Sequence, residues 1–549
     1  MIQLAKVWKI FASMPRREKI IVAVLSAVFV ISLGRFIIQQ LRFPVRSEKG
    51  IFAEGMVGHV RNLNPLFVDF SDADRDLSEL IFSGLMRYDP AAKNFFPDLA
   101  EKWERSSNGL TYTFTIRPNI LWHDKKPFTT DDVLFTFRDV IQDPGLRNPV
   151  LTNAFESVQV TSTGSSTVIF TLPKPNSYFI SHLTVGLLPK HILEQTPIAN
   201  LDKSSFGQRP IGTGPYMVQN LKLNATGDVV NLSAFPEYYG QKPLLEHLRF
   251  FTFPDEETLI SEQKALHAVS KIEKKSPSVK ALEEDGRFNF YPYTLNQFTA
   301  LYFNTDHGLL NEKRFRQALA QALNKNAAVT AGQQRVDSLD LQDHHDDPLF
   351  VFNPEAAGKT LDNMGLKMGA EGFRLNKKGE KISLKLLALS RTPPELIETL
   401  RNEWQTLGIQ IVVEKAETQD FSASVSQRMY DLLLIRQNLG YNRDVYPLFH
   451  SSQIGGVDGN PAGLNFANFK SFRTDGITEA IRKEKDSQDK EKLFRELSKV
   501  IAEEIPVVFL STHVYHYILD KRIAPFTVST LDYHSDRLSL LPYLEFPNL

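Results

Sequence analysis

The sequence predicts an α/β protein built from several lobes, and three observations support that prediction. The chain has 549 residues, more than a single hydrophobic core ordinarily serves, so we expect two or three lobes. Charged residues make up 23% of the chain and hydrophobic residues 42%, which is a globular composition. Between residues 381 and 416 a strand, a helix and a second strand follow one another. This βαβ pattern implies parallel strands joined by a right-handed crossover.

The N-terminal segment predicts a membrane anchor. Residues 20–38 are almost wholly apolar and span about 28 Å as a helix, close to the hydrocarbon thickness of a bilayer. Arg16, Arg17 and Lys19 precede this run, which predicts a cytoplasmic N-terminus. We therefore expect a cytoplasmic basic segment at 1–19, a single-pass transmembrane anchor at 20–41 and a stalk at 42–50. The bulk of the chain then lies outside the cell membrane, in the periplasm or at the cell surface.

Two alternatives to an anchor stay open. A cleaved signal peptide has an apolar core of similar length, although no Ala-x-Ala site follows residue 38. A buried core helix is the other alternative, and the basic flank argues against it.

Charge and cysteine content exclude several classes of function. The formal net charge is −1, so the chain has no overall attraction for nucleic acid. The absence of cysteine excludes disulfides, thiol nucleophiles, Cys-based zinc sites and iron–sulfur clusters. We expect no cofactor and no bound metal.

Hydrophobic periodicity predicts the elements in order. A first strand is expected at 51–60 and a helix at 72–86, where Leu77, Leu80, Ile81 and Leu85 recur at helical spacing. Apolar and Thr residues alternate over 110–116, a half-buried strand. Thr129 and Asp132 resemble a capping box at the start of the next helix. Further strands are expected at 157–160, 167–172, 216–220 and 228–235. In the second half we expect a strand at 300–305, a helix at 313–323, a strand at 381–389, a helix at 394–408, and strands at 409–416 and 430–437.

Several motifs resemble, in order, the family 5 extracellular solute-binding proteins of ABC transporters. The matching stretches include LNP at 63–65, IFSGLMRYDP at 81–90, LPKHIL at 188–193, IGTGPY at 211–216, LYFNT at 301–305 and FRQALAQALNK at 315–325. The most specific is the block from Pro97 to Phe137, PDLAEKWERSSNGLTYTFTIRPNILWHDKKPFTTDDVLFTF.

The resemblance implies a periplasmic-binding-protein-like type II fold: two lobes that close about a hinge, plus an extra lobe. The implied division places lobe I at 51–84, 209–296 and 511–549, the extra lobe with the signature block at 85–208, and lobe III, the second binding lobe, at 297–510. We expect the hinge in the strands near 297–304 and 507–513. The signature block then belongs to scaffold away from the ligand, and His123 anchors a turn rather than acting as a base or metal ligand.

The resemblance also locates the ligand contacts. Peptide binders of the family hold the ligand's amino group with an Asp in the loop that here spans 438–453. Asn442 takes that position, and Asp444 lies two residues further on. An Asn cannot neutralise an ammonium group, so a zwitterionic peptide is in doubt as the ligand. Polar residues also stand at the ends of the first strand and of the strand at 430–437, where ligands of α/β proteins bind. We therefore expect the ligand-binding residues to be His59, Arg61, Asn62, Arg436, Gln437, Asn438, Tyr441, Asn442, Asp444, His450, Ser451, Gln453 and Asn465.

Three other candidate sites have simpler explanations. Asp343 to Asp347, DHHDD, is expected to be a solvated loop, with weak divalent-ion binding as the alternative. His450, Ser451 and Ser452 do not predict a catalytic triad, because no orienting carboxylate can be identified in the sequence. The polar loop 450–469 is either a plain surface loop or a wall of the ligand cleft.

The chain is therefore expected to be a membrane-anchored, monomeric receptor. It captures a polar small solute or peptide and delivers it to the permease subunits of an ABC importer. A surface receptor or peptide-holding protein without transport is the alternative. A hydrolase is disfavoured because the sequence offers no activated nucleophile.

Overall fold

The computed structural model describes Pro15 and residues 51–68, 71–224, 227–263, 266–273, 277–329, 332–339, 351–455, 463–523, 525–539 and 541. The chain divides into two compact units, residues 1–51 with Leu549 and residues 52–548, and the second unit is described below. The predicted basic segment, anchor and stalk lie outside the described residues, apart from Pro15. Within the part of the chain that the structure describes, no helix combines the length and apolar character needed to cross a membrane.

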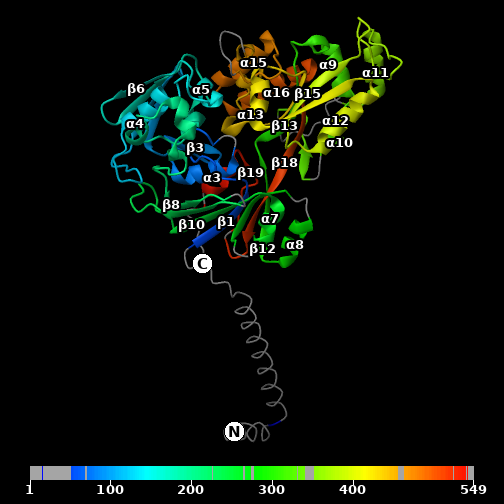
Figure 1. Ribbon diagram of the computed structural model, residues 1–549. Helices are drawn as coiled ribbons and strands as arrows, with labels where there is room; N and C mark the ends of the chain where they lie inside the picture. The colour runs from blue at the N-terminus through cyan, green and yellow to red at the C-terminus, as the bar shows by residue number, and fades with distance from the viewer. Residues whose placement is uncertain are drawn as a thin grey trace. The chain divides into compact units, whose positions relative to one another are not determined.

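A 13-stranded sheet runs through the residue ranges predicted as lobes I and III, and the predicted lobe names are used below for those ranges (Figure 1). The strands run in the order β16-β15-β17-β13-β18-β11-β1-β10-β9-β8, while β12, β14 and β19 pair off this path. Their bounds are β1 Ile51–Val57, β8 Tyr216–Lys222, β9 Val229–Ala234, β10 His247–Phe253, β11 Ala268–Ile272, β12 Phe288–Leu295, β13 Gln297–Phe303, β14 Gln333–Arg335, β15 Ser383–Leu389, β16 Gln410–Ala416, β17 Leu432–Asn438, β18 Val507–Asp520 and β19 Thr530–Leu531.

Strand β18 runs through both parts of this sheet. Its first half pairs antiparallel with β13 of lobe III, and its second half pairs with β11 and β12 of lobe I. β12 and β13 are consecutive in the chain, so they make a second connection between the same two parts. These are the strands in which the sequence predicts the hinge.

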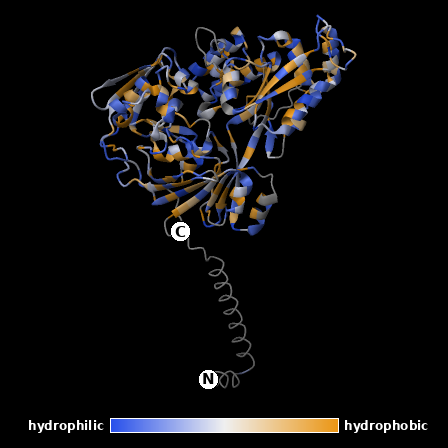
Figure 2. Ribbon diagram, viewed as in Figure 1, coloured by the Kyte–Doolittle hydropathy of each residue, from blue (hydrophilic) through white to orange (hydrophobic). Residues whose placement is uncertain are grey.

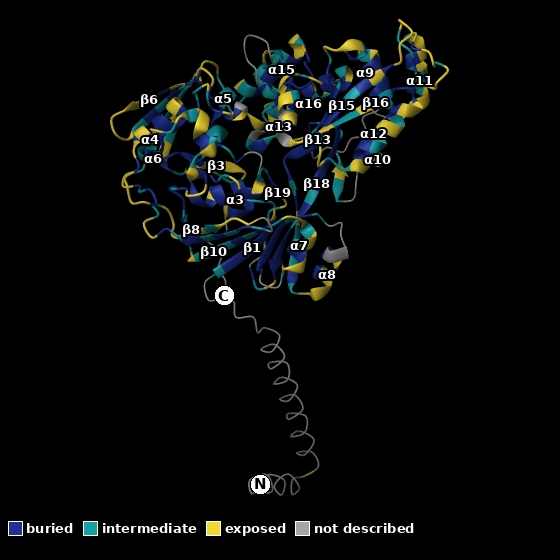
Figure 3. Cartoon of the chain, viewed as in Figure 1, coloured by how far each residue is buried: buried dark blue, intermediate teal, exposed yellow. Residues whose placement is uncertain are grey.

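Lobe III confirms the predicted βαβ unit. β15 and β16 pair in parallel, and α12 (Pro394–Thr406) connects them. β17 lies parallel to β15 on its other side, and all seven residues of β13 are buried. The other helices of this lobe are α9 Lys313–Gln321, α10 Lys325–Ala328, α11 Pro354–Asn363, α13 Thr418–Ser426, α14 Tyr446–Phe449, α15 Phe472–Lys483 and α16 Ser487–Glu504. Figure 2 shows the hydrophobic strands, and Figure 3 shows them buried behind helices with exposed outer faces.

Lobe I contains one departure from prediction. Helix α3 (Asp72–Ile81) ends five residues before the expected end at 86. The carbonyl oxygen of Ile81 accepts a hydrogen bond from the amide of Gly214 at 2.8 Å, and a Cβ on Gly214 would come within 2.7 Å of that oxygen. The chain then enters strand β2 (Met86–Asp89), so the close approach of a glycine loop overrides the helical periodicity. Lobe I also holds α7 (Glu256–Ser261) and α8 (Pro277–Asp285).

The extra lobe is an antiparallel sheet covered by short helices. Its four strands follow the order β4-β5-β7-β6, and β2 pairs with β3. The amide of Thr129 donates to the Asp132 carboxylate at 2.9 Å, as a capping box requires. The elements are β3 Asn94–Pro97, β4 Ala100–Arg105, β5 Thr111–Ile116, α4 Thr130–Leu134 with its π-helical continuation η1 Phe135–Val140, α5 Pro149–Ala154, β6 Gln159–Thr163, β7 Thr167–Thr171, η2 Phe179–Thr184 and α6 Lys190–Leu193.

The C-terminal residues return to the core of lobe I. The Arg537 guanidinium, on the short helix η10 (His534–Ser539), is fully buried between two carboxylates. Its Nε donates to Glu54 of β1 at 3.1 Å, and its Nη2 lies 2.7 Å from the Asp76 carboxylate of α3. Buried charges are tolerated only when paired, so this arrangement fixes the C-terminal segment against β1 and α3.

Candidate binding site

A cavity of about 1110 Å³ is lined by residues from the ranges predicted as lobe I, the extra lobe and lobe III. Pockets for drug-sized ligands have volumes of roughly 300–1,000 Å³, so this cavity suits a solute of at least that size. Both binding lobes and the extra lobe contribute to its lining, and many of the lining side chains are polar or charged. They include Asp72, Arg75 and Lys271 of lobe I, Lys174, Asn176 and His182 of the extra lobe, and Gln333, Arg391, Arg436, Gln437, Asp444, Tyr446 and Arg482 of lobe III, with His513 of β18.

The end of β17 provides the central wall. Arg436, Gln437 and Asn438 are the last three residues of this strand, and all three line the cavity. The short helix η8 (Gly440–Asn442) follows after a tight turn at Gly440, where φ is +63°. A Cβ at Gly440 would come within 2.7 Å of the Tyr533 hydroxyl, so close packing also favours glycine here.

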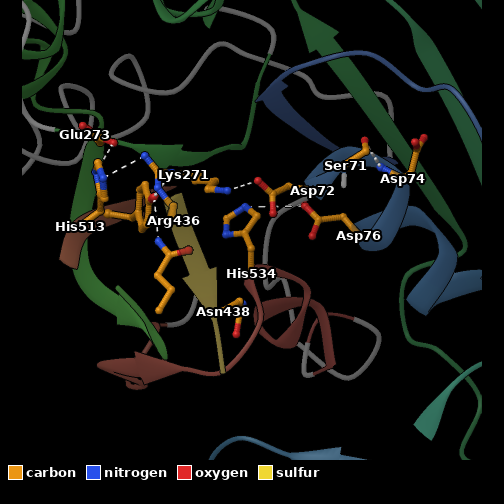
Figure 4. Close-up of polar contacts among 12 residues, drawn as sticks. Ser71, Asp72, Asp74, Asp76, Lys271, Glu273, Arg436, Asn438, His513 and His534 are labelled. Carbon is orange, nitrogen blue, oxygen red and sulfur yellow. Dashed lines mark hydrogen bonds and ion pairs between the residues drawn. The ribbon is translucent and has the colours of Figure 1, made fainter. Parts of the chain in front are cut away.

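A hydrogen-bonded series orients Arg436 (Figure 4). Its Nη2 donates to Nε2 of His513 at 2.9 Å, and Nδ1 of His513 lies 2.7 Å from the Glu273 carboxylate. Because Arg cannot accept a hydrogen bond, Nε2 of His513 is the acceptor and Nδ1 carries the proton toward Glu273. Arg436 Nη1 also donates to the Tyr515 hydroxyl at 3.2 Å. The Arg436 guanidinium of lobe III is thus held by side chains of β18 and, through His513, by a carboxylate of lobe I.

Asp444 is paired within its own lobe. Its carboxylate accepts two hydrogen bonds from Nε of Arg482, at 3.1 and 3.2 Å, and one from Nη2 at 2.6 Å. The same guanidinium lies 3.8 Å from the centre of the Tyr446 ring. All three residues line the cavity, so the acid that comes nearest to the expected amine-binding position already has a bidentate cation partner.

Tyr441 faces the cavity but is anchored to lobe I and the extra lobe. Its ring centroid lies 4.4 Å from that of Tyr88 and 4.8 Å from that of Tyr533. Its hydroxyl donates to Oδ1 of the Asp536 carboxyl group at 3.1 Å. Burial, followed by the nearby Asp532 and Glu79 charges, raises the pKa of Asp536 to about 8. Tyr441 therefore offers the cavity the surface of its ring, while its hydroxyl is already bonded.

The extra lobe contacts lobe III beside the cavity. Tyr178 belongs to the extra lobe, yet its buried ring packs into a hydrophobic cluster whose other members come from residues 298–509. Lys490 Nζ of α16 lies 4.3 Å from the centre of this ring and donates to the Ser177 hydroxyl at 3.0 Å. Lys174 and Glu479 pair across the same boundary at 3.4 Å.

The predicted ligand contacts divide into two groups. Six of them line the cavity, namely Arg436, Gln437, Asn438, Tyr441, Asp444 and Gln453. Six others are not among the described residues that line it, namely His59, Arg61, Asn62, His450, Ser451 and Asn465. The side chain of Asn442 lies outside the described residues.

The six residues outside the lining have structural contacts, which for Arg61 come from its backbone amide. His59 pairs with Asp228 at 3.4 Å, the Arg61 amide donates to Asp74 and Asn62 Nδ2 donates to the carbonyl of Asp202. These three follow β1, whose chain turns toward α3 instead of the cavity. Ser451 donates to Asp475 from both its amide and its hydroxyl, while Asn465 is fully buried and bonds the carbonyls of His450 and Phe469.

The structure does supply a carboxylate near His450. Nδ1 of His450 lies 2.8 Å from the Ser452 hydroxyl, and Nε2 lies 3.7 Å from Glu479. The sequence could not identify this carboxylate, because Glu479 lies on α15, far along the chain. Nδ1 also accepts the Ser452 amide at 3.1 Å, so His450 caps the short helix η9 (Ser451–Gln453). The amide and the hydroxyl of Ser452 therefore share one acceptor, a capping arrangement that accounts for the cluster.

His123 has the turn-anchoring contacts expected of scaffold. Its Nδ1 accepts the amide of Gly212 at 3.2 Å, and its Nε2 donates to the carbonyl of Gly214 at 3.0 Å. Burial lowers the pKa of His123 to about 4, so the ring is neutral at pH 7. None of residues 97–137, all of which are described, lines the cavity. Among the described residues there is also no group of three His, Asp or Glu that could hold a metal ion, and Asp343 to Asp347 lie outside them.

Sequence reasoning missed several lining residues, notably Asp72, Lys271, Arg482 and His513. Only His513 had a signal, because it lies at the end of the predicted hinge strand. Lys271 stands in the stretch HAVSKI, for which the sequence predicts no element. The distortion of β11 that turns Lys271 toward the cavity is not visible in the sequence.

The α/β sheet and the polar cavity between its lobes define a lobed binding protein. The family model of the bacterial extracellular solute-binding proteins, family 5, matches residues 94–456. The chain belongs to this family.

Curated relatives and solved structures cover nearly the whole chain. The oligopeptide-binding protein AppA of Bacillus subtilis is 25% identical over 515 residues, 89% of this chain and 90% of the relative. The dipeptide-binding protein of Escherichia coli is 22% identical over 510 residues, 87% and 92% of the two chains. The structure of NikZ from Campylobacter jejuni in complex with Ni(L-His) superposes with a TM-score of 0.73 at 24% identity, covering 91% of this chain and all of that one.

Proposed function

We propose that this protein is a membrane-anchored extracytoplasmic receptor. It captures a polar solute, such as a peptide, between its lobes and delivers it to the permease of an ABC importer. The observation that carries the proposal is the cavity of about 1110 Å³, to which both binding lobes contribute polar side chains. A ligand bound there contacts both lobes at once, so its binding energy favours the closed arrangement.

The names of the relatives support a peptide ligand. The relatives from B. subtilis and E. coli are named as oligopeptide- and dipeptide-binding proteins. The size of the cavity agrees with a ligand of several residues. A peptide also offers the amide groups that Gln437, Asn438 and Gln453 can bond.

The proposed ligand does not require a free amino terminus. Asn442 occupies the position at which peptide binders of the family carry an Asp. Asp444 is engaged by Arg482 through three hydrogen bonds, the shortest of 2.6 Å. An ammonium group would have to compete with this pair. Arg436 is available to an anionic group of the ligand, because its contacts to His513 and Tyr515 leave other donors of the guanidinium.

The proposed closing motion bends the strands that connect the lobes. β13 and the first half of β18 are the two segments that lead from lobe I into lobe III. We propose that residues 297–304 and 507–513 absorb the rotation, that the receptor acts as a monomer and that the segment at 20–41 anchors it. The other predicted contacts, His59, Arg61, Asn62, His450, Ser451 and Asn465, stay predictions.

Native mass spectrometry of the purified protein tests the proposal. The expected result is a bound polar solute whose mass disappears after mild unfolding and refolding. Adding the identified solute back to the refolded protein should restore the bound mass. A protein that carries no solute, and takes up none from a peptide pool or a cell extract, would overturn the proposed function.

A further inference from the structure

Lys271 is turned toward the cavity by a distortion of strand β11. The register between β11 and β18 shifts between Val269 and Ile272, which marks a bulge. Lys271 lies at this bulge with φ of +57°, a conformation that a non-glycine residue adopts at a cost. Bulges of this kind often re-aim one side chain next to a functional site. The result here is a lysine of lobe I that lines the cavity.

The Lys271 ammonium has hydrogen-bond donors that its contact with Asp72 does not use. It contacts the carboxylate of Asp72, at the start of α3, and lies 5.3 Å from the centre of the Tyr515 ring (Figure 4). An ammonium group has three donors, and one carboxylate contact leaves the others for a further acceptor. The Lys271 side chain is 22% exposed and Asp72 is 48% exposed, so a ligand can reach the pair from the cavity.

Positive charge gathers around Lys271. Burial lowers its pKa to about 7, and the nearby Arg436 is the next largest cause, followed by Arg537, while Glu273 opposes the shift. The charged and titratable groups that surround it come from every neighbouring element: Asp72 of α3, Glu273 after β11, Arg391 after β15, Arg436 of β17, Arg537 of η10, and His534 of η10, whose pKa burial lowers so that its ring is neutral. An acidic group between Lys271 and Arg436 would offset the repulsion between these two cations.

We propose that Lys271 is a specificity-determining residue, the contact in lobe I for an acidic group of the ligand. That group is a carboxylate, carried either by the C-terminus of a peptide or by an Asp or Glu side chain. Arg436 of lobe III and Lys271 of lobe I both lie beside Tyr515, so a single carboxylate between them contacts one cation from each lobe. The inference rests on the proposed function and adds the charge of the ligand to it.

Competitive capture from peptide pools tests the inference. Three synthetic tripeptide pools distinguish the source of the carboxylate: free C-termini, amidated C-termini, and free C-termini without Asp and Glu. We expect the wild-type protein to enrich peptides with a carboxylate at least tenfold over amidated peptides that lack Asp and Glu. Lys271→Met should abolish this enrichment. Lys313→Met is the matched control, because Lys313 pairs with Glu504 at 2.9 Å and is not a lining residue.

Lys271→Gly is a second variant, for the case that Lys271→Met folds poorly. Glycine adopts a φ of +57° without strain, and this substitution also removes the ammonium. Wild-type protein that retains peptides without regard to charge, or a Lys271→Gly protein that keeps the enrichment, would overturn the inference and leave the proposed function standing. Retention of no peptide from any pool or from a cell extract would instead overturn the proposed function.

Proton uptake gives a second, independent measurement. At pH 8 most Lys271 side chains are neutral if their pKa is about 7, and a bound carboxylate favours the charged form. Calorimetry of the best-retained peptide in two buffers of different ionisation enthalpy should therefore show proton uptake by the wild type. Lys271→Met should remove that uptake, whereas Lys271→Arg should keep the preference for a carboxylate without it. Equal uptake by the wild type and Lys271→Met would count against the inference.

Discussion

The amide of Ser177, in the extra lobe, donates a hydrogen bond of 2.7 Å to the carbonyl oxygen of Arg482, in α15 of lobe III. This bond joins the extra lobe to lobe III beside the cavity, whose lining includes Arg482. Tyr178, the next residue, packs into the cluster of lobe III, and Lys490 contacts both residues. We call residues 174–178 the clasp, and we expect it to hold the closed form.

Replacing the aromatic ring of the clasp should weaken ligand binding. Tyr178→Ala removes a buried ring that lobe III contacts, a change worth about 3 kcal/mol when such a ring is lost from a core. This contact forms between lobes, so losing it should destabilise the closed form relative to the open form. Ligand affinity should therefore drop at least tenfold. The chain has no cysteine, so spin labels at Ser165→Cys and Arg495→Cys can report the distance between the lobes. Lys492→Met, at an exposed site on α16, is the control, and an unchanged distance distribution in Tyr178→Ala would contradict the clasp.

The His123 contacts predict a stability defect without a binding defect. His123→Ala leaves the amide of Gly212 and the carbonyl of Gly214 without their partners, at a cost of roughly 2–4 kcal/mol. Ligand affinity should stay within a few-fold, because His123 does not line the cavity. Thermal unfolding and titration calorimetry measure the two effects separately. His191→Ala, which loses one bond to Asp124, should cost less stability.

The same histidine predicts a dependence on pH. Burial lowers the pKa of His123 to about 4 from an ordinary 6.5. Between those values the unfolded state binds more protons, so acidification from pH 7 to pH 4.5 should cost the wild type about 2 kcal/mol through this group. The His123→Ala variant has no imidazole at this position, so its stability does not fall with pH through this group. The difference in urea midpoint between wild type and variant should therefore shrink at pH 4.5, and a constant difference would mean that His123 is not held neutral.

The state of Asp444 predicts how a peptide ligand tolerates acetylation. Its pairing with Arg482 leaves little charge for a ligand ammonium, so N-acetylation should weaken binding by less than roughly 1.4 kcal/mol, a tenfold step. Calorimetry with free and acetylated forms of the same peptide gives the comparison. A loss of a hundredfold or more, reproduced with free peptide by Asp444→Asn, would show that this acid binds the amine after all.

The charge that precedes the apolar segment predicts topology. Arg16, Arg17 and Lys19 should keep the N-terminus in the cytoplasm, so a reporter fused after residue 60 should be active only outside the membrane. Reporter activity in the cytoplasm would contradict this topology. A mature N-terminus near residue 40 would show that the segment is cleaved and does not anchor the protein.

Local patterns predicted the elements well and the site only partly. The βαβ unit at 381–416 and the capping box at Thr129 depend on neighbouring residues, and both are present. The strand-end residues Arg436 to Asn438 were found for the same reason. The early end of α3 depends on Gly214, and the partner of Asp444 is Arg482, 38 residues away. The position of Lys271 in the cavity lining depends on a bulge of β11 against β18. Each of these features arises from contacts between distant segments, which no local pattern contains.

The return of the chain to lobe I determines when folding can finish. β1 contains residues made early in synthesis, but Glu54 of that strand is paired with Arg537, and β11 is completed only by β18. Lobe III is continuous from 297 to about 510 and includes the first half of β18, so it can form before the second half of that strand and η10 emerge. Lobe I cannot, because its sheet lacks a strand and its core carboxylates lack their cation. A chain that is still being synthesised therefore holds an incomplete lobe I, and its final folding step must wait until the second half of β18 and η10 have been made.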